Sequence, residues 1–417
     1  MLKKFFLKNS YGLIGLDQLL VTATGFILSI VLARRFGLEG LGLFALAQTG
    51  LMFCALIHAA FVNMPISTTF TQFSSRSDSL DRDTYFATSH HLTMLLIAFM
   101  TIFCSLIIIY FFKFKDLTSI LLGIIVCIIP MLTFYYLRAI SLAEFDYISA
   151  LKMDATYSFI LIFSIVFFEL PSVISVLYIC SASWVLACLV ANVKWLRFKI
   201  NFRESRIIFK RCWDEGKWLF GYRVLAYFRG NMVVFLLGFH SGVSSVGILR
   251  VLQTLYGPIN VFLAGLDSFL PQVGTKIYAS SGLSNLLKYC GKVGAALLAV
   301  WTLYTLGILL HWELLLEMFF SLSDPGLGIL VAMQAAFSLV VIANVIIPII
   351  VRIAGDVASL TLIPLLELSL YIVPGFILVR EYSVAGALIW QFTAALSSAI
   401  LMCVFFVIFI RRGYLKK

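Results

Sequence analysis

The 417-residue sequence has little charge: only 12% of its residues are Asp, Glu, Lys or Arg, about half the share found in soluble globular domains. It also lacks the motifs that carry most enzyme chemistry. Its five histidines show no metal-ligand spacing, and no phosphate-binding Gly-rich loop, Gly-x-Ser-x-Gly or Cys-x-x-Cys motif occurs. These absences argue against a soluble enzyme, and we expect neither a metal nor an organic cofactor.

Apolar residues are abundant, at 62% of the chain, and the mean hydropathy is +1.03. Hydrophobic runs of about 20 residues, the length of a membrane-spanning helix, recur from end to end. The sequence therefore predicts an all-α polytopic membrane protein with about twelve transmembrane helices. The predicted spans are approximately 11–33, 41–65, 91–112, 118–137, 155–170, 172–193, 218–239, 245–270, 289–310, 326–350, 357–379 and 384–410.

The positions of the basic residues predict the topology. With a cytoplasmic N-terminus, 23 Lys and Arg fall in inner segments, five in outer loops and three within spans. This asymmetry favours N-in and C-in, because positive residues are retained on the cytoplasmic side. The net charge of +11 is thereby explained by membrane topology, and we expect no nucleic-acid partner.

The longest and most basic connection is KWLRFKINFRESRIIFKRCWDEGK, residues 194–217. We interpret it as a cytoplasmic linker that contacts anionic lipid headgroups, and its amphipathic pattern is compatible with a helix on the membrane surface. It separates an N-terminal six-helix lobe, residues 1–193, from a C-terminal six-helix lobe, residues 218–417.

The two lobes repeat each other at a constant offset of 205 residues. Glycine and Gln-Thr matches without a gap carry this alignment, because apolar matches alone arise by chance in such a composition. The pairs are Gly25–Gly230, Leu32–Leu237, Gly37–Gly242, Gly42–Gly247, Gln48–Gln253 and Thr49–Thr254. Six spans separate the copies, so we predict a parallel repeat with a pseudo-two-fold axis along the membrane normal, an architecture of transporters. The loops 34–40 and 240–245 would then be equivalent outer turns.

Two arginines stand out within the seventh predicted span. Arg229 falls near the middle of a hydrocarbon core of about 30 Å, where facing lipid costs at least about 2.5–3.5 kcal/mol. Arg223 is shallower and within snorkelling reach of the inner interface. We predict that both face a polar cavity and bind an anionic substrate, while a buried ion pair remains the alternative. Tyr222, Tyr227 and Asn231 broaden the same polar arc.

Three acids also lie within predicted spans. Asp17 aligns with Tyr222 in the repeat and lies at about the depth of Arg223, so we consider a contact between Asp17 and Arg223. Glu367 is a candidate proton or cation site, with a hydrogen-bonded structural acid as the alternative. Asp267 lies near the inner end of the eighth span, close to the interface. Transport driven by H⁺, by Na⁺ or by the substrate gradient itself stays open.

The segment ILSIVLARRFGLEGLGLFALAQT (27–49) resembles the opening of bacterial polysaccharide or O-antigen flippases of the Wzx type, and REYSVAGALIW (380–390) resembles their late loop. This family belongs to the superfamily that also contains multidrug exporters and lipid II flippases. The resemblance implies a V-shaped pair of helix bundles, with the first, second, seventh and eighth spans lining a central cavity. It also implies an undecaprenyl-pyrophosphate-linked oligosaccharide as substrate, and the bacterial inner membrane as location.

Three other functions remain as alternatives. A multidrug or cation exporter of the same superfamily would favour acids in its cavity over arginines. A lipid II flippase would carry two further spans. An integral-membrane glycan polymerase or ligase would need a large outer loop, and no predicted outer loop exceeds about fifteen residues. We expect membrane lipids, the lipid-linked substrate and other polysaccharide-assembly membrane proteins as partners.

Overall fold

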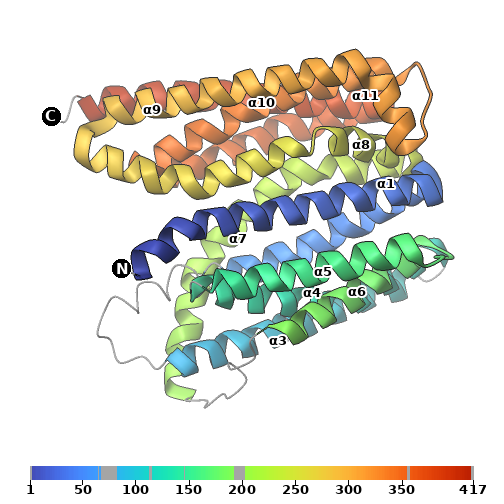
Figure 1. Cartoon of the computed structure of the whole chain (residues 1–417), viewed down its shortest axis with the longest axis horizontal. Helices are drawn as coiled ribbons and strands as arrows, with labels where there is room; N and C mark the ends of the chain where they lie inside the picture. Colours follow the sequence, from blue (N-terminus) through green and yellow to red (C-terminus); the bar gives the residue numbers. More distant parts are fainter. Residues whose placement is uncertain are drawn as a thin grey trace. The chain divides into compact units, whose positions relative to one another are not determined.

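The computed structural model describes residues 2–63, 65–66, 82–111, 115–144, 146–191, 202–354 and 357–414 (Figure 1). Within these ranges nearly every residue is helical and none is in a β-strand. The elements are α1 (Leu2–His58), the π-helical turn η1 (Ala59–Asn63), α3 (Arg82–Phe111), α4 (Lys115–Ala143), α5 (Tyr147–Phe167), α6 (Val173–Val190), α7 (Phe202–Ser241), α8 (Val243–Leu255), α9 (Pro258–Phe320), α10 (Leu327–Ala354) and α11 (Val357–Tyr414).

Among the described residues, eight helical stretches are long and apolar enough to cross a membrane. The shortest, Val173–Val190, has a mean hydropathy of 2.3. Large apolar side chains point outward from these helices, as at Phe159, Leu189 and Leu310, which are 70%, 71% and 77% exposed. Such a surface suits lipid tails rather than water. The prediction of an all-α polytopic membrane protein is confirmed, and the count of twelve spans stays a prediction.

Three long helices reverse direction at a single residue instead of through a loop (Figure 1). The break lies at Gly37 (φ 68°) in α1, at Gly282 (φ 75°) in α9 and at Ser383 (φ 51°) in α11. All three occupy the region of positive φ that glycine enters without a Cβ penalty. The chain therefore turns where we expected connections, at 34–40 and between residues 270 and 289, but each turn is shorter than predicted because helix continues on both sides of the glycine.

The eighth predicted span is interrupted. Residues 245–270 comprise nearly all of α8 and the start of α9, and the helix breaks at Tyr256 and Gly257. Pro258, which follows directly, has no N–H to continue the helical hydrogen bonds and is well suited to the first turn of the next helix.

The seventh helix begins earlier than the sequence predicts. α7 starts at Phe202 rather than at residue 218, so most of the basic connection is helical and runs directly into the span. The part of that connection before Phe202 lies outside the described residues. A helix over 202–217 agrees with the amphipathic pattern of this segment, and its interpretation as a linker between two lobes stays a prediction.

The chain forms two compact units. The first consists of Met1–Val31 and Leu43–Val224, and the second of Leu32–Gly42 and Leu225–Lys417. In the first unit, α4 packs against α3, α5 and α6; in the second, α10 packs against both α9 and α11. The lobe boundaries at residues 193 and 218 stay a prediction, and residues 202–224 pack with the first unit.

The repeat reappears in the backbone. Gly37 and Gly242, which the offset of 205 pairs, both have positive φ, at 68° and 86°, and extended ψ, at −170° and 168°. Thr49 and Thr254, another pair, each donate a hydrogen bond of 2.7 Å to the carbonyl four residues earlier, at Ala45 and Arg250. Equivalent residues thus have equivalent local structure.

The second compact unit also contains a reciprocal contact between repeat-related residues. A Cβ placed on Gly42 would lie 2.0 Å from the carbonyl oxygen of Val243, and one placed on Gly247 would lie 2.0 Å from that of Leu38. Leu38 and Val243 are themselves separated by 205 residues. A contact in which i meets j′ and i′ meets j is the signature of a two-fold axis, here relating two segments of one chain.

Candidate functional site

The predicted polar residues of α7 are placed only in part. The side chains of Tyr222 and Arg229 lie outside what the structure describes. Arg223 is half-buried, and Tyr227 is buried at 8% exposure. Asn231 donates from Nδ2 to the carbonyl oxygen of Tyr227 at 3.2 Å, so its amide is held against its own helix. A substrate-binding role for these five residues stays a prediction.

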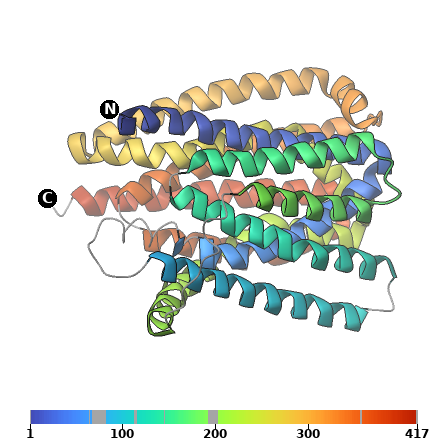
Figure 2. The same cartoon turned by 60° about the horizontal axis from the view of Figure 1, so that its bottom comes forward.

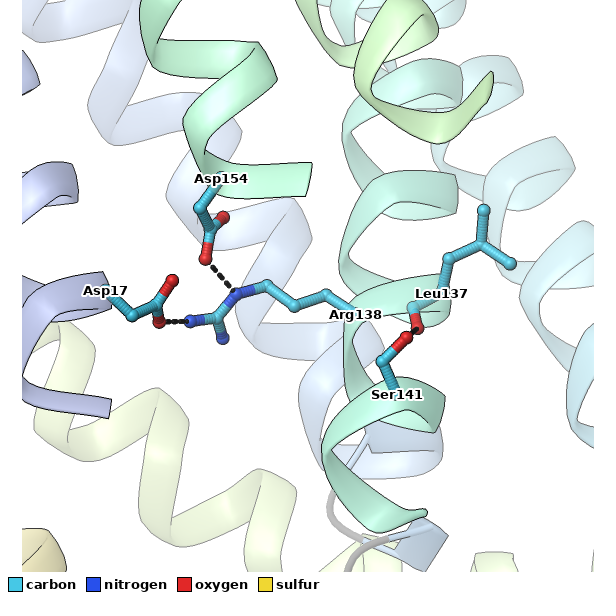
Figure 3. Close-up of polar contacts among 5 residues, drawn as sticks. All are labelled: Asp17, Leu137, Arg138, Ser141 and Asp154. Atoms are coloured by element: carbon cyan, nitrogen blue, oxygen red, sulfur yellow. Dashed lines mark hydrogen bonds and ion pairs between the residues drawn. The ribbon is translucent and has the colours of Figure 1, made fainter. Parts of the chain in front are cut away.

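Of the three acids predicted within spans, only Asp17 has a described side chain, and those of Asp267 and Glu367 lie outside the described set. Asp17 is 5% exposed on α1. It pairs with Arg138 of α4 through Oδ2 (Figure 3). The structure thus gives Asp17 a partner that the sequence did not indicate, and the contact that we considered between Asp17 and Arg223 stays a prediction.

Arg138 joins three helices of the first compact unit. Its Nη2 donates to Asp17 of α1, and its Nε donates to Oδ2 of Asp154 of α5 at 2.7 Å (Figure 3). The side chains of Asp17 and Asp154 are 8% and 3% exposed, and that of Arg138 is 21% exposed. We call these three residues the acidic triad. Its hydrogen bonds fix the relative positions of α1, α4 and α5.

The charge of the acidic triad is not balanced. Two carboxylates and one guanidinium carry one excess negative charge when all three are ionised. In addition, Asp17 Oδ1 is buried without a hydrogen-bond donor among the described residues. Removing a charge from water costs several kcal/mol unless it is compensated. A proton or a monovalent cation at the carboxylates would supply both the missing charge and a partner for Oδ1.

Sequence reasoning missed Arg138 and Asp154 because of where the predicted spans stop. The fourth span was ended at residue 137 and the fifth begun at residue 155, so each boundary excludes one of the charged residues. The helices in fact continue to Ala143 and begin at Tyr147. The sequence did contain a signal: Arg138 and Asp154 have opposite charges and lie at the facing ends of the fourth and fifth spans, and Asp17 is an acid in the first span.

The described residues contain no group of three or more His, Cys, Asp or Glu side chains that could hold a metal ion. The acidic triad brings together two carboxylates around a guanidinium instead. Its chemistry is therefore electrostatic: it can anchor helices, and it can bind a small cation or a proton.

The fold is that of transporters of the MOP superfamily. A multidrug-resistance MATE transporter in an inward-facing conformation superposes with a TM-score of 0.77 over 94% of this chain and 95% of that chain, at 16% identity. The lipid II flippase MurJ, in an inward closed conformation, superposes with a TM-score of 0.71 over 94% of this chain and 85% of that chain, at 13% identity. A MOP-superfamily transporter from Pyrococcus furiosus superposes with a TM-score of 0.65 over 98% of this chain and 97% of that chain, at 14% identity.

The sequence itself places the chain more narrowly. The family described as polysaccharide biosynthesis protein matches residues 7–269, more than half of the chain. The protein belongs to this family, and the resemblance to polysaccharide flippases that the sequence suggested is confirmed at the level of the family. No curated protein sequence matches the chain significantly.

Proposed function

We propose that the protein is a flippase that moves an undecaprenyl-pyrophosphate-linked oligosaccharide repeat unit from the cytoplasmic to the outer leaflet of the bacterial inner membrane by alternating access. Membership in the polysaccharide biosynthesis family is the observation that carries the proposal. The fold shared with transporters, one of them described as a lipid II flippase, supports it. The N-in and C-in topology and contacts with other polysaccharide-assembly membrane proteins belong to the same proposal.

In this proposal, Arg229 and Arg223 attract the pyrophosphate. A guanidinium is permanently charged, and its planar set of donors matches phosphate oxygens in pairs. The lipid tail stays in the bilayer while the charged headgroup passes the low-dielectric centre, which is the step that needs compensation. Tyr222, Tyr227 and Asn231 contribute hydrogen-bonding groups on the same helix.

The acidic triad is our candidate for H⁺ or Na⁺ coupling, with Asp17 as the residue that the sequence already indicated. Its excess negative charge and the unpartnered Asp17 Oδ1 are the features that a transported proton or cation would neutralise. Glu367 and Asp267 remain further candidates for the same role.

The test is complementation of a deletion strain. Loss of the gene should abolish surface polysaccharide and cause lipid-linked oligosaccharide to accumulate on the cytoplasmic side. Arg229→Ala should fail to restore surface glycan at normal protein level, whereas Arg229→Lys, which retains the charge, should restore part of it. Normal glycan in the deletion strain, together with increased retention of cationic drugs, would instead favour a multidrug exporter.

A further inference from the structure

The first half of α7 has a face that is docked on the protein. Ser205 accepts a hydrogen bond of 2.9 Å from the hydroxyl of Thr88 in α3. Ile208 and Cys212 are 2% and 4% exposed and belong to one apolar core with residues of η1, α3 and α4. At about 100° per residue, these three side chains form one stripe, which holds residues 202–213 against the first compact unit.

The other side of this helix exposes both apolar and basic groups. Phe209 and Trp213, one turn apart, are 45% and 53% exposed, and Ile207 is 54% exposed. Arg206 and Lys210, also one turn apart, are exposed as well. At about 100° per residue, the aromatic row lies beside the docked stripe and the basic row lies beyond it. This is the pattern of a helix that lies in the membrane interface.

The direction of the helix agrees with this pattern. In Figure 1, α3, α4, α5 and α6 run roughly parallel, and the first half of α7 crosses them; Figure 2 views that half nearly along its axis. It packs at helix ends: Thr88 is in the second turn of α3, and Phe61, which stacks on Trp213 at 5.5 Å between ring centroids, is in η1 at the end of α1. A helix that crosses the ends of spanning helices lies in the plane of the membrane surface.

We propose that residues 202–213 form a binding surface for anionic phospholipid headgroups. Arg206 and Lys210 contact the lipid phosphates, while Phe209 and Trp213 enter the boundary between headgroups and acyl chains. The positive charge of this surface favours an anionic lipid as the ligand. The basic row pairs with the lipid headgroup, and the acyl chains of the same lipid then lie beside the exposed aromatic rings. A soluble protein partner would not account for the aromatic row.

The experiment measures how close each lipid comes to Trp213. The full-length protein is reconstituted in bilayers that contain brominated phosphatidylglycerol or brominated phosphatidylcholine, because bromine quenches tryptophan fluorescence at short range. Subtracting the signal of Trp213→Phe isolates this residue from the other six tryptophans. A single basic residue near an anionic surface increases binding about fivefold. We therefore expect the affinity of the site beside Trp213, measured by quenching, to be at least about fivefold higher for phosphatidylglycerol than for phosphatidylcholine, and we call this ratio the lipid preference.

Arg206→Gln combined with Lys210→Gln should bring this preference close to one. The matched control is Lys276→Gln combined with Lys288→Gln, which removes two exposed charges from α9 and should leave the preference at Trp213 unchanged. Raising the salt concentration to about 1 M, where screening acts over about 3 Å, should reduce the preference in the unmodified protein, which requires no variant to fold.

Equal quenching by the two lipids in the unmodified protein would overturn the proposal. A preference for phosphatidylglycerol that persists after the Arg206 and Lys210 substitutions would also overturn it. The same holds if the control pair lowers the preference equally, because the effect would then follow from overall charge rather than from this surface.

Discussion

Substituting Gly42 by alanine tests the reciprocal contact between the two repeats. The new Cβ would lie 2.0 Å from the carbonyl oxygen of Val243, whereas ordinary Cβ contacts are at 3.4–4 Å, so about 1.4 Å must be absorbed by backbone atoms. Overpacking of this kind costs about 1–3 kcal/mol. Gly247→Ala creates the same clash with Leu38, and we therefore expect the two variants to be destabilised by similar amounts.

Thermal unfolding in detergent, followed with a thiol-reactive fluorophore, provides the assay. Six of the eight cysteines are buried and become reactive when the helices separate. For a unit of about 200 residues, 1 kcal/mol corresponds to about 2–4 °C, which predicts a decrease in Tm of about 2–12 °C for each variant. The controls are Gly25→Ala and Gly230→Ala, another repeat-related pair, whose added Cβ would meet nothing within 4 Å.

These control substitutions should raise stability by up to about 1 kcal/mol, because alanine is the better helix former. An unchanged Tm in Gly42→Ala, or a decrease in only one of the two clashing variants, would refute the reciprocal contact. A decrease in the control variants would show that the assay responds to any change in these helices.

Further substitutions follow from single features of the structure. Arg138→Leu should lower stability by about 3–5 kcal/mol, because it leaves two buried carboxylates without their cation; replacing both aspartates by asparagine in the same chain should recover most of the loss in Tm. Gly37→Ala and Gly242→Ala should each cost about 1–2 kcal/mol, because both positions have positive φ, again measured as Tm. Gly375→Ala should be destabilising by about 1–3 kcal/mol and alter tryptophan fluorescence, because its Cβ would lie 2.1 Å from Trp390.

The sequence predicted the fold class well because its signals are strong and local. Runs of about 20 apolar residues determine membrane-spanning helices almost alone. The boundaries were less predictable. Hydropathy ended the first helical segment before Gly37, yet a single glycine can reverse the chain without a loop. Likewise, the amphipathic pattern after residue 201 was compatible with a helix, but it did not show that this helix continues without a break into the seventh span.

The candidate site was less predictable than the fold. Asp17 was recognised as a buried acid, but its partner was not, because Arg138 was assigned to an inner loop on account of its charge. A charged residue within a helix is tolerated when its partners come from other helices, and that information is in the tertiary structure rather than in any local pattern. Because Arg138 lies in a helix, it no longer counts among the Lys and Arg of the inner segments. The excess of basic residues in the inner segments over the outer loops, which favours N-in and C-in, remains large.

Three glycine pairs share the offset of 205 residues, and the structure gives them different constraints. Gly37 and Gly242 are required by their positive φ, and the pair at 42 and 247 is required by the close approach of a carbonyl oxygen. Gly25 and Gly230 have ordinary helical surroundings with open space at the Cβ position. Repeat-related positions can therefore share a glycine although the structure requires glycine at only some of them. Substitutions by alanine should be costly at the first two pairs and favourable at the third, so a chain in which all three pairs responded alike would contradict the assignment of distinct roles.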